Sequence, residues 1–385
     1  MTTKASLNSI FKEKFGTDAT VTVKSPGRIN IIGEHTDYNN GFVLPAAIDK
    51  YIYVALSERN DNELHLISGD YNEAFQTELD ADYAIAPDWA KYIIGVSQLI
   101  QKRTSKLTGF NLYVVGDVPL GAGLSSSAAF SCATAYGLNE LFNCDITRVE
   151  IAKIGQQTEH EYIGLKCGIM DQFASVLGKD NHAIQLDCRD LTYKYVPIDW
   201  SEYEILLLNT NVKHTLASSA YNKRRESCEQ GVQWVKEQFP EVESLRDVTE
   251  SQLESIVKPK DIDTFTKCLF VVQENQRLLK ACDALASNKI EELGKLLFEA
   301  HWALSTQYEV SCPELDFLIT AAQTSSHVVG ARMMGGGFGG CTINIVRKGE
   351  SDNFINEIET NYENKFNLKL TPIRVNLGEG SSILN

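Results

Sequence analysis

The run GAGLSSS at residues 121–127 constrains the chain more than any other stretch, because it joins an apolar segment to a run of small residues typical of a helix. Gly121 and Gly123 lack a Cβ, so the backbone can take a positive φ there and bring its N–H groups close to an anion. The serines can cap a helix that begins near Ala128 and whose positive end points at the same place. We therefore predict a strand over 110–115, this helix and, between them, a loop that binds phosphate.

Two well-known phosphate loops do not match this run. A Walker loop ends in Gly-Lys-Ser/Thr, and no lysine lies between residues 116 and 138. A dinucleotide-binding loop needs a third glycine where Ser126 stands. Taken alone, the run is also compatible with a flexible, serine-rich helix start that binds nothing. The remaining pattern, PxGxGLSSSA, resembles the phosphate loop of the GHMP kinases, the family of galactokinase, homoserine kinase and mevalonate kinase.

A second informative stretch, SPGRINIIGEHTDYNNGFVLPAAI at residues 25–48, places charged side chains between apolar runs. Its polar residues include Arg28, Glu34, His35, Thr36 and Asp37. Carboxylates accept protons from sugar hydroxyls and an imidazole either donates or accepts, so such a set suits a carbohydrate site. A surface loop with fortuitous charges is the alternative, and the flanking apolar runs disfavour it.

Within this stretch, the string GRINIIGEHTDYNNGFVLP resembles the signature of the galactokinases, one branch of the GHMP kinases. The resemblance implies that Glu34, His35, Thr36 and Asp37 hold the sugar hydroxyls. It also implies that Arg28 lies near the transferred phosphoryl group. A planar, permanently charged guanidinium suits both a phosphoryl oxygen and an ionised carboxylate.

The segment GLKCGIMDQFASVLG at residues 164–178 contains the expected catalytic base. Its glycines end the preceding helix and place Asp171 in the first turn of a new one, where the helix dipole favours an ionised carboxylate. From the residues alone, an N-terminal helix Asp without chemistry is the simpler interpretation. The string CGIMDQF resembles galactokinases, which implies that Asp171 is the base and that Gly168 lies against the sugar. The same resemblance implies that Tyr221, in the segment 210–225, contacts the sugar.

The resemblance further implies ATP as co-substrate and Mg²⁺ as metal. A capping box at residues 147–150 begins a helix that we expect to reach residue 162 and to carry Glu159. By itself such a Glu is more often a solvated surface residue. Alignment with the family marks Glu159 and Ser127 as magnesium ligands, and Mg²⁺ usually has few protein ligands. The nucleotide contacts implied by the resemblance are Ser68, Trp89, Gly121, Ala122, Gly123, Leu124, Ser125, Ser126 and Ser127.

A third glycine-rich run, GARMMGGGFGGCTINIV, covers residues 330–346 and predicts a strand over 342–346. By itself it is compatible with a glycine-rich hairpin. It resembles the third GHMP motif, which implies that it steadies the phosphate loop and lines the site.

Composition limits the class of partner. The chain has 385 residues and a formal net charge of −15, which argues against nucleic acid or an anionic membrane surface as the main partner. Nine cysteines without a CxxC pair are typical of reduced thiols in a cytosolic protein. No stretch approaches the roughly 20 uninterrupted apolar residues of a membrane span, and no apolar run of signal-peptide length stands at the amino end. We expect a soluble, cytoplasmic monomer whose partners are small molecules.

The motifs occur in family order from residue 25 to residue 346, so the resemblance covers nearly the whole chain. It implies a two-domain α+β fold of the GHMP type, with a ribosomal-protein-S5-like domain over 1–195, a ferredoxin-like split βαβ domain over 196–385 and the active site in the cleft between them. We expect strands over 182–196 to cross to the second domain and one last strand over 368–384. Residue periodicity alone predicts only a mixture of helices and strands.

The implied function is ATP-dependent phosphorylation of α-D-galactose at its C1 hydroxyl, giving galactose 1-phosphate for the Leloir route, with Asp171 as base and Arg28 as transition-state stabiliser. Two alternatives stay open. One is an N-acetylgalactosamine 1-kinase, which would have a larger pocket at the sugar 2-position. The other is a non-catalytic sensor of galactose and ATP. Sensors of this type retain the binding residues but have a damaged loop or base, whereas Ser127, Arg28 and Asp171 are all present here.

Overall fold

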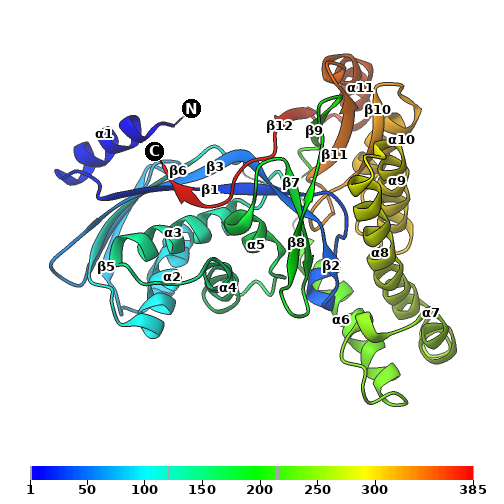
Figure 1. Ribbon diagram of the computed structural model, residues 1–385, viewed down its shortest axis with the longest axis horizontal. Coiled ribbons are helices and arrows are strands. Elements are labelled where there is room, and N and C mark those ends of the chain that lie inside the picture. Colours follow the sequence, from blue (N-terminus) through cyan, green and yellow to red (C-terminus); the bar gives the residue numbers. More distant parts are fainter. Residues whose placement is uncertain (1, 120, 213–216, 385) are drawn as a thin grey trace.

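The structure is a computed structural model that describes residues 2–119, 121–212 and 217–384 (Figure 1). It has two lobes, each built on its own β-sheet, and a small third sheet lies where the lobes meet. Leu120, within the predicted phosphate loop, and residues 213–216, within the segment expected to contact the sugar, lie outside the described residues. Across the described ranges, no helix has the length and apolar character needed to cross a lipid bilayer.

The first lobe contains a six-stranded sheet in the order β13-β1-β3-β6-β4-β5, in which β4 and β6 are parallel and the other neighbouring pairs are antiparallel. Its strands are β1 (Val21–Asn30), β3 (Pro45–Glu58), β4 (Glu63–Ser68), β5 (Glu73–Glu78), β6 (Phe110–Gly116) and β13 (Ser382–Ile383). One face is covered by α2 (Asp88–Thr104), α3 (Ser126–Phe142), α4 (Arg148–Thr158) and α5 (Met170–Leu177), and the other by α1 (Lys4–Phe15) (Figure 1).

Residues 53–56 of β3 are all buried, and they point alternately into two apolar cores, which explains why this sheet is covered on both faces. Val54 and Leu56 belong to the main apolar core. Tyr53 and Ala55 point to the opposite face, where they pack against Leu7 of α1. Successive side chains of a strand point to opposite faces, so a strand that is apolar on both sides needs an apolar partner on each.

The second lobe contains a four-stranded antiparallel sheet in the order β10-β11-β9-β12. Its strands are β9 (Tyr203–Asn209), β10 (Val328–Met333), β11 (Cys341–Arg347) and β12 (Thr371–Val375), and its helices are α6 (Ala217–Lys236), α7 (Glu250–Gln252), α8 (Ile262–Ala286), α9 (Ile290–Thr306), α10 (Pro313–Thr324) and α11 (Ser351–Phe366). The third sheet consists of β2 (Phe42–Val43), β7 (His182–Asp187) and β8 (Tyr193–Pro197). Single 3₁₀ turns occur at Asp37–Asn39, Tyr83–Ile85 and Leu245–Asp247, and π turns at Glu159–Ile163 and Leu253–Val257.

The predicted two-domain α+β architecture is confirmed, and so are the elements around the phosphate loop. The strand predicted over 110–115 is β6, and the helix predicted from about residue 128 is α3, which begins slightly earlier, at Ser126. The helix predicted from residues 147–150 ends at Thr158 and continues as the π turn that contains Glu159.

Two predictions about chain path are wrong. The stretch 182–196 does not cross to the second lobe, because β7 and β8 form a hairpin that pairs with β2. The stretch 368–384 contains two strands in different sheets: β12 belongs to the second lobe, whereas β13 pairs with β1 in the first. Between them, Gly380 packs so closely on α5 that a Cβ there would lie 2.4 Å from the carbonyl oxygen of Val176.

The expected division of the chain at residue 195 falls inside β8. Because β13 returns to the first lobe, that lobe is built from both ends of the chain. A single cut therefore does not separate the two lobes, and the sheet that carries β1 depends on residues from the carboxyl end.

Candidate active site

The phosphate loop between β6 and α3 has the backbone conformation predicted for it. Gly121 and Gly123 both have a φ of 72°, and Ser125 has a left-handed φ of 58°. The side chains of Ala122 and Leu124, two residues of this loop, are buried. A left-handed φ is unusual for a residue with a Cβ, and such residues concentrate at functional sites. The loop therefore turns sharply into the first turn of α3.

Ser125 does not cap α3, contrary to the prediction that the serines cap this helix. It occupies the N-cap position without a side-chain capping bond. Its hydroxyl donates instead to Oδ2 of Asp171. The N–H groups at the start of α3 consequently have no partner from this serine, which leaves them available to an anion.

The phosphate loop is held from two directions. The N–H of Arg28 donates to the carbonyl oxygen of Leu124 over 3.1 Å, and a Cβ on the preceding Gly27 would lie 2.7 Å from that oxygen. On the other side, a Cβ on Gly335 would lie 3.7 Å from the carbonyl oxygen of Gly123. Both β1 and the glycine-rich segment between β10 and β11 therefore pack against the loop, as the resemblance implied for the third motif.

The guanidinium of Arg28, on β1, joins this loop to Asp171 in the first turn of α5. Nε and Nη2 of Arg28 donate to the two carboxylate oxygens of Asp171 over 2.7 and 2.8 Å, and Nη1 donates to the carbonyl of Gly123 over 2.6 Å. Burial, the largest single effect, lowers the pKa of Arg28, but the charge and hydrogen bonds of Asp171, together with the charges of Glu34 and Asp37, raise it overall. A bidentate pair of this kind fixes both groups in direction as well as in distance.

A cavity of about 290 Å³ opens beside this pair. Its lining residues are Arg28, Glu34, His35, Asp37, Leu165, Cys167, Gly168, Met170, Asp171, Tyr221, Gly335, Gly336, Gly337 and Phe338. The volume is at the small end of the range for ligand pockets, which suits a single sugar ring. The lining comes from both lobes, so the cavity lies in the cleft between them.

Of the residues predicted to bind sugar, Thr36 is absent from this lining. Its hydroxyl lies 2.9 Å from the carbonyl oxygen of Gly33 and 2.6 Å from that of Phe42. Thr36 therefore closes the turn that carries its neighbours, and the structure brings the other predicted sugar residues together around the cavity.

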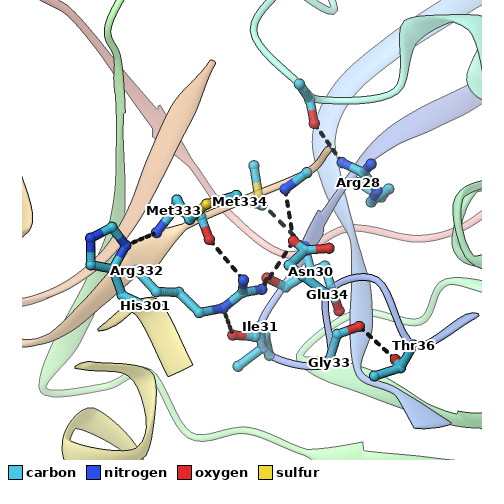
Figure 2. A network of polar contacts seen from close by, with 12 residues as sticks. Arg28, Asn30, Ile31, Gly33, Glu34, Thr36, His301, Arg332, Met333 and Met334 are labelled. Atoms are coloured by element: carbon cyan, nitrogen blue, oxygen red, sulfur yellow. Dashed lines mark hydrogen bonds and ion pairs between the residues drawn. The ribbon is translucent and has the colours of Figure 1, made fainter. Parts of the chain in front are cut away.

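Arg332, fully buried on β10, contacts Glu34 but does not itself line the cavity (Figure 2). Nη2 of Arg332 lies 3.2 Å from Oε1 of Glu34, and the same oxygen accepts the N–H of Gly335 over 2.7 Å. Nη2 also donates to the carbonyl of Asn30, and Nε and Nη1 donate to the carbonyls of Ile31 and Met333. Arg332 thus supplies the countercharge that a buried carboxylate requires.

Asp37 lies against Gly168, where no side chain could fit. A Cβ on Gly168 would lie only 1.8 Å from Oδ2 of Asp37. Burial, and then the charge of neighbouring Asp171, raise the pKa of Asp37 to about 7. A carboxyl group that titrates near neutrality in a cavity is typical of functional sites.

His35 forms another wall of the cavity. Burial lowers the pKa of His35 to about 3, so its imidazole is neutral at physiological pH. Nδ1 lies 2.7 Å from the hydroxyl of Tyr38, whereas Nε2 has no hydrogen-bond partner among the described residues. The ring centroid of Tyr221 lies 5.4 Å from that of His35.

The predicted magnesium ligands, Ser127 and Glu159, lie together where α3 begins and α4 ends. The nearly buried Glu159 carboxylate accepts a hydrogen bond from Nε2 of Gln172 over 3.2 Å and one from Sγ of Cys167 over 3.5 Å. The Ser127 hydroxyl lies close enough to lower the pKa of Glu159. Burial, and then the charge of Asp171, raise the pKa of Glu159 to about 7. A divalent cation would offset this buried negative charge, so the pair fits Mg²⁺. Within the described ranges, no cluster of at least three His, Cys, Asp or Glu side chains could hold a metal ion.

Ser68 and Trp89, the predicted nucleotide contacts outside the loop, meet at one end of β4. Ser68 pairs with Glu73 across β4 and β5, and Nε1 of Trp89 donates to Oε2 of Glu73 over 2.8 Å. Ser68 also pairs with Val114 on β6, the strand that leads into the phosphate loop. Both side chains are nearly buried, at 2% and 7% exposure, and their contact with a nucleotide stays a prediction.

Several lining residues were not predicted as site residues. Leu165, Cys167 and Met170 lie in the segment that carries Asp171, and Phe338 lies in the third glycine-rich run. The sequence feature that could have indicated these residues is their position inside the two motifs already described. Arg332 also lies in the third motif, but its partner Glu34 is 298 residues away in the chain, so no local pattern indicates the contact.

Family models match the chain in three places. The galactokinase galactose-binding signature matches residues 9–58, the GHMP kinases N terminal domain matches 91–179, and the GHMP kinases C terminal model matches 279–364. Together with the fold and the loop, these matches define a GHMP kinase.

Individual relatives narrow this class. The galactokinase of Thermotoga maritima is 42% identical over 90% of this chain and 95% of its own, and that of Chloroflexus aurantiacus is 38% identical over 98% and 97%. The structure of Lactococcus lactis galactokinase complexed with galactose superposes with a TM-score of 0.92 at 33% identity, covering 98% of this chain and 99% of that one. The mevalonate kinase of Methanococcus jannaschii, at 18% identity and a TM-score of 0.67 over 93% of this chain and 98% of its own, shares the fold. The chain therefore belongs to the galactokinase family, and it is a kinase that transfers phosphate to a sugar hydroxyl.

Asp37 predicts a pH-dependent stability of the ligand-free protein. Its pKa is raised to about 7 from an ordinary value near 4, so the folded state binds the proton more tightly than the unfolded state. The stability due to this proton is fully present below about pH 4 and is lost as the pH rises through 7. Each pH unit in this window is worth at most about 1.4 kcal/mol. We expect Asp37→Asn to raise Tm by several degrees at pH 8 relative to the wild type, and hardly at pH 4.

Thermal unfolding without sugar measures this difference. Asp145→Asn is the control, because the Asp145 side chain is 91% exposed and its variant should follow the wild type at both pH values. An Asp37→Asn gain of equal size at pH 4 and pH 8 would contradict the prediction.

Proposed function

We propose that the chain catalyses ATP-dependent phosphorylation of α-D-galactose at its C1 hydroxyl, giving galactose 1-phosphate for the Leloir route. The observation that carries this proposal is the bidentate Arg28–Asp171 pair, with contacts of 2.7 and 2.8 Å, between a sugar-sized cavity and a phosphate loop. At this point the Asp171 carboxylate can accept the proton of a hydroxyl, and the Arg28 guanidinium can bind a phosphoryl group. The names of the relatives and the galactose in the Lactococcus lactis complex support galactose as the sugar.

In the proposed mechanism, Asp171 accepts the proton of the C1 hydroxyl as that oxygen attacks the γ-phosphorus of ATP. The new O–P bond forms while the bond from phosphorus to the ADP oxygen breaks. Arg28 and the Ser125 hydroxyl both donate to the Asp171 carboxylate and keep it directed at the cavity. Arg28 also offsets negative charge on the transferred group, so most of the rate gain comes from positioning and electrostatics.

The sugar contacts that we propose are Glu34, His35, Asp37, Gly168 and Tyr221, all of which line the cavity. The carboxylates of Glu34 and Asp37 accept hydroxyl protons, and absence of a side chain at Gly168 leaves room for Asp37. The hydrogen bonds of Thr36 to backbone carbonyls support an indirect role for it, in shaping the turn.

ATP is the proposed co-substrate, with its phosphates on residues 121–127 and its base near Ser68 and Trp89. Mg²⁺ would be held by Ser127 and Glu159, and when bound it neutralises charge on the phosphates. We further propose a cytoplasmic monomer that acts on small molecules rather than on nucleic acid or membranes, which the net charge of −15 supports.

A substrate panel tests the function. We expect ADP formation with ATP and Mg²⁺ on galactose, and little on N-acetylgalactosamine, glucose, homoserine or mevalonate. Asp171→Asn should lower the rate on galactose by about 10²- to 10⁴-fold, because it removes the general base. Asp145→Asn is the control and should retain the wild-type rate.

Other outcomes of the panel would change the assignment. Turnover on N-acetylgalactosamine in preference to galactose would identify an N-acetylgalactosamine 1-kinase. Binding of galactose without ADP formation on any member of the panel would identify a sensor. Wild-type turnover by a folded Asp171→Asn variant would remove Asp171 from the mechanism.

Arg28→Lys tests the geometry of the pair separately from its charge. Lysine keeps the positive charge but cannot make two parallel hydrogen bonds to Asp171. We expect kcat on galactose to fall by about 10²- to 10³-fold. Arg189→Lys is a matched control, because Arg189 pairs with Asp247 on the surface. Near-normal turnover of Arg28→Lys would exclude the bidentate geometry as a requirement.

Ser127→Ala tests the proposed magnesium site. Loss of this hydroxyl should raise the Mg²⁺ concentration needed for half-maximal ADP formation by about tenfold. The control is Ser131→Ala on the same helix, since the Ser131 hydroxyl donates to the carbonyl of Ala128 over 3.1 Å. An unchanged Mg²⁺ requirement in Ser127→Ala would argue against Ser127 as a ligand.

A further inference from the structure

A chain of hydrogen bonds behind the cavity ends on His35. Nδ1 of His35 lies 2.7 Å from the hydroxyl of Tyr38, which lies 2.9 Å from the hydroxyl of Tyr308, which in turn lies 3.4 Å from Sγ of Cys228. We call Tyr38, Tyr308 and Cys228 the tyrosine relay. None of these three residues lines the cavity, whereas His35 does.

The relay joins the two lobes. Tyr38 lies in the 3₁₀ turn Asp37–Asn39 of the first lobe, Tyr308 lies between α9 and α10, and Cys228 lies on α6. Tyr308 is fixed in place, because Arg224 Nε donates to its carbonyl over 2.6 Å and its ring centroid lies 4.6 Å from that of Phe270. A hydroxyl held this firmly can fix the hydroxyl of Tyr38, and through it the His35 ring.

The direction of the relay decides what His35 offers to a ligand. A neutral imidazole has one N–H, so if Tyr38 donates to Nδ1, the proton of His35 is on Nε2. Burial raises the pKa of Tyr38 and of Tyr308 well above the ordinary value, so both keep their protons. In this direction the Tyr308 hydroxyl donates to the Tyr38 hydroxyl, and the Tyr38 hydroxyl donates to Nδ1 of His35. Each hydroxyl proton then makes one hydrogen bond.

Two features of the cavity favour this direction. Glu34, Asp37 and Asp171 are hydrogen-bond acceptors when ionised, so a ligand that gives them its hydroxyl protons needs a donor for its oxygens. Nε2 of His35 is buried, has no partner among the described residues, and belongs to a residue held at a left-handed φ of 62°.

We propose that Tyr38 and Tyr308 are positioning residues that hold His35 with its proton on Nε2, where it donates a hydrogen bond to a hydroxyl oxygen of the bound sugar. The sugar part of this inference rests on the proposed function. The tautomer part concerns the ligand-free protein and does not depend on which sugar binds.

Imidazole ¹⁵N chemical shifts of the full-length chain labelled at histidine test the tautomer without any ligand. His35→Gln identifies the His35 signals by their loss. We expect a hydrogen-bonded, unprotonated Nδ1 and a protonated Nε2 in the wild type, and a mixture of tautomers in Tyr38→Phe. A protonated Nδ1 in the wild type would overturn the relay, even if galactose is phosphorylated.

Kinetics on galactose test the positioning role, because Tyr→Phe removes a single oxygen atom. Tyr38→Phe should raise the KM about tenfold, the effect of one hydrogen bond of about 1.4 kcal/mol, with kcat little changed. Tyr308→Phe should raise it less. The double variant should be no worse than Tyr38→Phe, because Tyr308 acts only through Tyr38.

Tyr362→Phe is the matched control, since Tyr362 is fully buried and its hydroxyl donates to the carbonyl of Thr210 over 2.7 Å, in the second lobe. It should lower Tm without changing the KM for galactose. Additive effects of Tyr38→Phe and Tyr308→Phe, or an unchanged KM in Tyr38→Phe, would overturn the positioning role. If the variants do not fold, the ¹⁵N shifts of the wild type still decide the tautomer. If instead the proposed function is wrong, those shifts are unaffected, because they are measured without a ligand.

Discussion

The geometry of the site depends on one buried guanidinium. Arg28 extends from β1 and binds the Asp171 carboxylate with two N–H groups and the phosphate loop with a third. Breaking a buried ion pair by removing one partner costs about 3–5 kcal/mol, because the remaining charge is left uncompensated. The need to satisfy Arg28 therefore fixes β1, the loop and the start of α5 in one arrangement. The proposed base and the phosphate cradle keep their spacing because they share this cation.

The other carboxylates in and beside the cavity are electrostatically unfavourable without a ligand. Asp37 and Glu159 both have a pKa raised to about 7, in each case by burial first and by Asp171 second. Asp171 itself is paired with Arg28, and Glu34 is paired with Arg332. The two unpaired carboxylates are those that the proposal assigns to a sugar and to a cation. Such a site trades stability of the empty protein for affinity.

Local patterns predicted part of this site and could not predict the rest. The positive φ of Gly121 and Gly123 and the place of Asp171 in a first turn follow from residues close together in the chain. The sugar-binding set needed the family resemblance as well, because the same charges are compatible with a surface loop. Arg332 and Tyr308 were missed, since their partners lie 298 and 270 residues away. Contacts that join the two lobes leave no periodicity in either segment.

The pairing of β13 with β1 has a consequence for how the protein is made. The edge of β1 at Val23 and Lys24 stays without its partner until the ribosome has synthesised residues 382–383. An open edge of this kind is a template for pairing with another chain. During translation the strand that carries Arg28 therefore has an open edge until residues 382–383 have been synthesised. The pairing of β13 both completes the sheet and closes this route to aggregation.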